Sequence, residues 1–237
     1  MAVIKITQRQ LERLILEVSS DGPVIDLKNP EFWYQDAVNP AMGKVFGWLK
    51  KNIHKKSGTL NLEETWPYPV SPEAIDEYDV GSTYYEIDVE IKKASFQEGH
   101  PGWNLSGGAV DRGHANGIDI ILELDPDLEI SEELLEEIED DLLDTLAHEI
   151  HHMTQWGALE RLNCPIYANI SGNNDFEYFR QCDEKPAFII GFRARASRKN
   201  TTVEQLMKDY LQNYVNVGRI TEKQAEEVLR DWLGYEF

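Results

Sequence analysis

The stretch that most constrains this chain is 144–155, which contains His-Glu-x-x-His at His148, Glu149 and His152. On a helix, residues four apart lie on one face, so the two imidazole rings can bind one metal ion from the same side. Glu149 is rotated from His148 by about 100°, which leaves its carboxylate free to reach a water molecule on the metal. A hydrolytic zinc site needs this combination of ligands, open position and base.

The flanking sequence predicts that this stretch is helical. Ser131 is a suitable N-cap, and the acidic residues Glu132 and Glu133 suit the positive end of a helix dipole. Apolar residues then recur at three- and four-residue steps, and Gly157 is the expected stop. They are Leu135, Ile138, Leu142, Leu146, Ile150 and Met153. The competing interpretation is a chance pattern with histidines on a solvated helix face. His151 lies off the ligand face, where we expect a supporting or surface role.

Two segments carry a resemblance to known enzymes. His148–His152 resembles the active-site helix of the zincin metallopeptidases, and 178–188 resembles the glutamate-bearing segment of the gluzincins, often Glu-x-x-Ala. The sequence Glu184-Lys185-Pro186-Ala187 fits that second pattern. The resemblance implies an α+β, zincin-like fold with a small twisted sheet packed on an active-site helix and additional N- and C-terminal helices. It also implies zinc-dependent peptide hydrolysis by a metal-bound water, with Glu149 as general base.

A catalytic zinc site needs a third protein ligand besides His148 and His152. The downstream carboxylates are Glu177, Asp183 and Glu184, and the resemblance favours Glu184. Pro186 lacks a backbone N–H and fits only the first turn of a helix, so Glu184 must stand at the helix start. Asp183 is the alternative ligand, and it is also the better candidate for a helix N-cap.

The same resemblance implies a side chain that donates a hydrogen bond to the oxyanion. Tyr178 and Tyr167 are the candidates, although most tyrosines in such a domain simply pack. His100 and His114 lie in a glycine-rich segment and are further candidates.

Two stretches alternate between apolar and polar residues, which predicts half-buried strands at 84–93 and 117–124. The resemblance implies that 117–124 is a sheet edge that pairs with extended substrate; an internal strand is the alternative. The intervening segment 96–110 is predicted to be loop-rich because it contains several glycines. The acidic block at 125–144 lacks the spacing of a calcium loop and is predicted to be a solvated helix face.

The remaining chain is predicted to be a helical scaffold around this unit. A helix begins at Pro40 within 32–56, and 57–72 is rich in turn formers. Two C-terminal helices follow, the second with a capping box between Thr221 and Gln224. We expect one domain, 1–237, with a helical and loop part at 1–80, strands and metal helix at 81–160, and a helical part with the third ligand at 161–237.

The N-terminal segment predicts a helix that begins near Thr7. The sequence 5–15 is similar to the starts of uncharacterised tailed-phage proteins, which implies a viral source and no chemistry.

The net charge of −20 argues against nucleic-acid binding, because phosphates would be repelled. It is compatible with a peptide or protein substrate and with a basic partner.

No membrane-spanning segment or signal peptide is recognisable, so we expect a cytoplasmic protein with no membrane partner. The two cysteines, Cys164 and Cys182, are expected as free thiols. The alternative function is a non-catalytic acidic binding protein with a structural or vestigial zinc site; the oligomeric state is not predicted.

Overall fold

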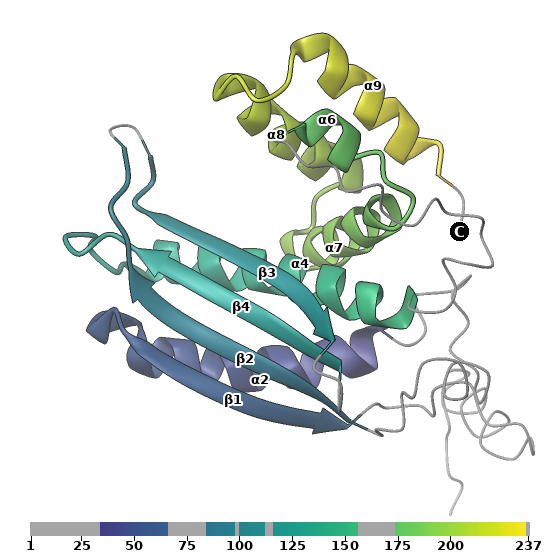
Figure 1. Ribbon diagram of the computed structural model, residues 1–237. Coiled ribbons are helices and arrows are strands. Elements are labelled where there is room, and N and C mark those ends of the chain that lie inside the picture. The colour runs from purple at the N-terminus through teal and green to yellow at the C-terminus, as the bar shows by residue number, and fades with distance from the viewer. Residues whose placement is uncertain (1–33, 66–83, 98–99, 112–115, 156–173, 236–237) are drawn as a thin grey trace, which may run out of the picture.

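The computed structural model describes residues 34–65, 84–97, 100–111, 116–155 and 174–235 (Figure 1). The part up to residue 155 contains the sheet and two helices that cover it. Its elements are α2 (Tyr34–Asn52), η2 (Ile53–Lys55), β1 (Gly58–Thr65), β2 (Tyr84–Lys93), β3 (Trp103–Asp111), β4 (Asn116–Leu124) and α4 (Glu132–Gln155). The part from residue 174 to 235 is helical, with α6 (Asp175–Tyr178), α7 (Glu184–Lys199), α8 (Val203–Asn216) and α9 (Glu222–Leu233). The mixed α+β class is confirmed.

The four strands form one mixed sheet in the order β1-β2-β4-β3. β4 is parallel to β2 and antiparallel to β3, and β1 is antiparallel to β2. The strands predicted at 84–93 and 117–124 are confirmed. The prediction that 117–124 is a sheet edge is wrong, because β3 pairs along its full length and makes β4 an internal strand.

The apolar face of the sheet packs on α2 and α4, which lie side by side behind it in Figure 1. The alternating residues of the two central strands are buried there because successive strand side chains point to opposite faces. They are Tyr85, Ile87, Val89, Ile91, Ile118, Ile120, Leu122 and Leu124. The His-Glu-x-x-His motif therefore lies on a helix that is fixed along its opposite side by a hydrophobic core.

A second core is formed by α6 to α9 and is rich in aromatic side chains. Trp232 is almost fully buried, and its indole N–H donates a 2.9 Å hydrogen bond to the carbonyl of Phe179. α7 belongs to both cores, with Ile190 in the first and Phe188 in the second. α7 is thus the element that joins the helical part to α4.

Several helix boundaries follow the predicted signals. The Ser131 hydroxyl accepts from the N–H of Leu134 at 3.2 Å and caps α4. The capping box between Thr221 and Gln224 at the start of α9 is confirmed. Pro40 was predicted to start a helix, but it lies inside α2, which begins six residues earlier at Tyr34.

Two of the strands, β1 and β3, were not predicted from the sequence. The segment 96–110 was expected to be a loop, yet it contains most of β3, whose Gly107 and Gly108 interrupt the apolar pattern. The segment 57–72 contains β1, in which Leu60 and Leu62 alternate with polar residues. The helix predicted near Thr7, and the segment 5–15 that carries the tailed-phage resemblance, lie outside the described residues.

Cys182 forms a disulfide, so the prediction of a free thiol at this position is wrong. Sequence spacing alone does not specify which thiols become close in a fold. Among the described helices, none combines the length and apolar character needed to traverse a bilayer.

Candidate metal centre

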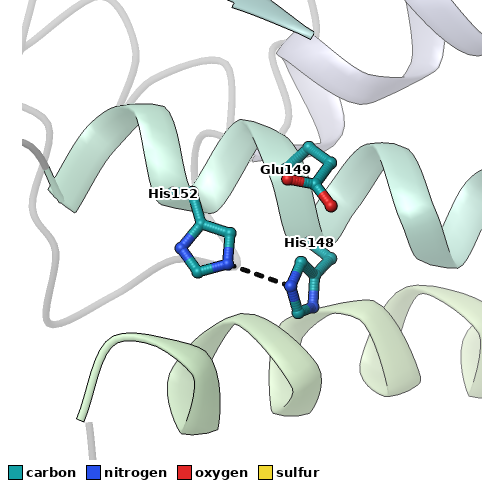
Figure 2. A group of neighbouring side chains, drawn as sticks. All are labelled: His148, Glu149 and His152. Carbon is teal, nitrogen blue, oxygen red and sulfur yellow. Dashed lines mark hydrogen bonds between the residues drawn. The ribbon is translucent and has the colours of Figure 1, made fainter. Parts of the chain in front are cut away.

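His148 and His152 lie one turn apart on α4 and point toward α7, as Figure 2 shows. Their Nε2 atoms are 2.9 Å apart. Both residues stand near the end of α4 and are mostly buried. Two imidazole nitrogens this close can share one cation, which is the arrangement that the four-residue spacing predicts.

Glu184, the first residue of α7, completes a three-atom cluster with the two histidines. Its Oε2 lies 3.2 Å from Nε2 of His148 and 3.3 Å from Nε2 of His152. This oxygen is buried and accepts no hydrogen bond of good geometry. A buried carboxylate oxygen without such a bond is costly unless a cation satisfies it.

The separations between these three atoms match a tetrahedral metal site. Ligand bonds of about 2.0–2.1 Å at tetrahedral angles place two ligand atoms about 3.3 Å apart. The observed separations of 2.9, 3.2 and 3.3 Å lie close to that value. Two imidazoles and one carboxylate are a donor set that zinc accepts, with one position left for water. The residues present therefore fit a zinc ion.

Burial and charge act together on this cluster. Burial alone would raise the pKa of the Glu184 carboxyl, but His148 and His152 outweigh it and lower the pKa to about 2. Burial acts to lower the pKa of His152, whereas the Glu184 carboxylate raises it above its usual value. Glu184 is therefore ionised and matched to positive charge at this position.

Glu149 is buried and lies beside the two histidines on the side of α4 that faces the sheet. One oxygen of Glu149 lies within 4.8 Å of the nitrogens of His148 and His152, so these three residues can also hold a metal ion. Figure 2 shows that its carboxylate points away from α7, unlike the two rings. The close approach of Glu184 to both rings, together with the opposite direction of Glu149, favours Glu184 as the third ligand.

β3 packs closely over Glu149 because Gly107 has no side chain. A Cβ at Gly107 would overlap the methyl group of Thr145 and would lie 3.0 Å from Cγ and 3.1 Å from Oε1 of Glu149. β3 and the general-base candidate are thus in direct contact. Sequence analysis missed this role of Gly107, since only the folded sheet places it over α4.

Tyr178 lies beside the cluster, with 37% of its surface exposed. Burial and then the Glu184 carboxylate raise the pKa of its hydroxyl well above the usual range, and the hydroxyl lies within hydrogen-bonding reach of Glu184. Its ring also contacts Phe188, whose ring packs edge-on against His148 with centroids 4.7 Å apart. The structure therefore brings one oxyanion candidate to the cluster.

The other candidates are placed as follows. Asp183 is buried at the N-cap position of α7 and its carboxylate does not bond the helix end. Glu177 is exposed on α6, and His100 is exposed and stacks on Phe96.

His151 is buried, so the prediction of a surface position for it is wrong. Burial and then its two histidine neighbours lower the pKa of His151 to about 3. Tyr167 and His114 lie outside the described residues.

Ion pairs fasten α7 against α4 on the far side of the cluster. Arg195 contacts Asp141 at 2.5 Å and Asp144 at 3.7 Å. Arg198 and Lys199 both pair with Asp140 at 2.7 Å. The partners run in opposite directions along the chain, so α7 lies antiparallel to α4. Sequence reasoning missed this contact, although the complementary spacing of acids on one helix and bases on the other was a signal.

In comparisons with known proteins, no protein-family model, no curated protein and no solved structure matches the chain.

Proposed function

We propose that this protein is a zincin-like, zinc-dependent peptidase in which His148, His152 and Glu184 hold the metal. The observation that carries the proposal is the convergence of two imidazole nitrogens and one orphaned carboxylate oxygen at 2.9–3.3 Å from one another. The chemistry of this donor set selects zinc over magnesium or calcium, which prefer all-oxygen sites.

A bound zinc ion would supply Lewis-acid polarisation of a carbonyl and a more acidic water. Glu149 accepts a proton from the attacking water and passes it to the nitrogen of the leaving amine. Tyr178 donates a hydrogen bond to the oxygen on which negative charge develops. Because Glu149 is buried beneath β3, its carboxylate is held in one place and needs little reorganisation during the reaction.

The proposed substrate is an extended peptide that adds to the edge of β3. Within the described part of the chain, β3 has a paired neighbour on one side only, and it lies over α4 at Glu149. Main-chain hydrogen bonds to such an edge hold a peptide without requiring a particular sequence. This assignment replaces the predicted role of β4, and it places a peptide beside the base.

The proposal is tested with zinc-loaded protein and a library of fluorescence-quenched peptides. We expect cleavage by the wild type, loss of cleavage in the presence of a chelator, and recovery after zinc is returned. Glu149→Gln should retain zinc and lose hydrolysis by about 10²- to 10⁴-fold. Zinc binding without cleavage in the wild type would favour the alternative of a non-catalytic binding protein.

A further inference from the structure

The contact between α4 and α7 has a point of very close approach at Gly191. A Cβ built on Gly191 would overlap Oδ1 of Asp144 and would lie 3.0 Å from the backbone oxygen of the same residue. Side chains at helix interfaces normally hold the axes about 8–10 Å apart. The absence of a side chain at Gly191 is therefore what allows α7 to approach α4 here.

Gly191 lies on the same face of α7 as Glu184. The two residues are separated by seven positions, or almost two full turns, so they differ by only about 20° around the helix and about 10 Å along it. On α4, Asp144 precedes His148 and His152 by one and two turns and shares their face. The antiparallel pairing thus brings Gly191 to Asp144 and Glu184 to the histidines.

Arg195, one turn after Gly191, holds α7 against α4 on the side of Gly191 that faces away from the metal cluster. Arg195 contacts both Asp141 and Asp144, so the carboxylate next to Gly191 is held and cannot swing aside freely. Asp144 is also partly buried at this interface. A side chain at position 191 must therefore displace either α7 or a carboxylate that is already paired.

We propose that Gly191 is a positioning residue for the metal centre, and that its close contact with Asp144 sets the distance of Glu184 from His148 and His152. The inference rests on the proposed function, because it assumes that the three-residue cluster binds zinc. If α7 moved roughly 1 Å away from α4, Oε2 of Glu184 would leave the tetrahedral spacing, since zinc–ligand bonds deviate by only about 0.2 Å from their normal lengths. Gly191 acts through Glu184 and touches neither metal nor substrate.

The test measures zinc affinity of the full chain by competition with a chromogenic chelator. Gly191→Ala should weaken zinc binding by about 10- to 100-fold, the range typical of lost support around metal ligands. The visible absorption of the Co²⁺-loaded variant should differ from that of the wild type, because the coordination sphere changes. Gly47→Ala is the matched control, since Gly47 is also helical and a Cβ there would meet nothing within 4 Å; its zinc affinity should be that of the wild type.

The double variant Gly191→Ala/Asp144→Ala removes the overlapping carboxylate and should restore part of the lost zinc affinity, because the backbone oxygen of Asp144 stays 3.0 Å from the added Cβ. This variant also decides the question if Gly191→Ala alone does not fold, since restored folding together with zinc binding supports the inference. Wild-type affinity in a folded Gly191→Ala, or a folded double variant that stays as weak as the single one, would overturn it. A wild type that binds no zinc would instead refute the proposed function and, with it, the premise of this inference.

Discussion

Oε2 of Glu184 lies 3.2 Å from Nε2 of His148, although the two residues belong to different helices and different parts of the chain. The pair exists because α7 runs antiparallel to α4 and begins at the level of the histidines. Neither helix alone brings together His148, His152 and Glu184. The candidate chemistry therefore depends on a helix–helix contact as much as on the motif.

Removal of the Glu184 carboxylate should weaken zinc binding more than any change outside the ligand set. We expect Glu184→Ala to lose about 100-fold or more in zinc affinity, since changes to the groups around metal ligands alone commonly cost 10- to 100-fold. Isothermal titration with a competing chelator measures the change. Asp183→Asn is the control, because this neighbouring carboxylate lies at the N-cap position; a larger loss in Asp183→Asn than in Glu184→Ala would reverse the assignment.

A side chain at Gly107 should disturb the base without removing the ligands. In Gly107→Ala the new methyl group overlaps Thr145 and crowds Glu149, so we expect kcat for peptide cleavage to fall by at least about tenfold. Zinc affinity should stay within about threefold of the wild type. The matched control is Gly108→Ala on the opposite face of β3, where a Cβ would meet nothing within 4 Å. Equal losses in both variants would contradict a specific role for Gly107.

Tyr178 should contribute to hydrolysis through its hydroxyl group. Tyr178→Phe keeps the ring that contacts Phe188 and removes the hydrogen-bond donor. We expect kcat/KM to fall by about 10²- to 10³-fold, as for the loss of one oxyanion donor, with zinc stoichiometry unchanged. Activity equal to that of the wild type would assign the role to another donor.

The Asp144 carboxyl should make folding stability depend on pH. Burial raises its pKa from 3.8 to about 7, although Arg195 acts in the opposite direction. Between about pH 4 and 7 the folded chain then holds a proton that the unfolded chain releases, so this group stabilises the fold increasingly as pH falls through 7. The slope is at most about 1.4 kcal/mol per pH unit.

The measurement compares the free energy of unfolding of the wild type and Asp144→Asn by urea denaturation with chelator present. We expect the difference to shift in favour of the wild type from pH 8 to pH 5. The other titratable groups are the same in both proteins, so their contributions largely cancel in this difference. A difference that is constant with pH, or that shifts the other way, would show that Asp144 is ionised throughout this range.

The elements that could be predicted from the sequence are those that depend on residues close to one another along the chain. The period of α4, its Ser131 cap and the alternation of β2 are properties of neighbouring residues, and each is seen in the structure. Glu184 became a candidate through a resemblance of its flanking segment, and Pro186 correctly indicated a helix start there.

The parts that escaped prediction depend on contacts between distant segments. β3 looks like a loop because Gly107 and Gly108 weaken its pattern, yet Gly107 is required where the strand lies on α4. The internal position of β4 depends on that unpredicted strand. Gly191 reads as an ordinary helical glycine until α7 is placed against Asp144, and the disulfide of Cys182 has no local signal.

The most direct test of the metal centre is a crystal structure of the zinc-soaked protein with anomalous diffraction data at the zinc edge. The account predicts one strong anomalous peak within about 2.0–2.2 Å of Nε2 of His148, Nε2 of His152 and a carboxylate oxygen of Glu184. A peak bound by Glu149 in place of Glu184, or no peak at this cluster at full zinc loading, would contradict it.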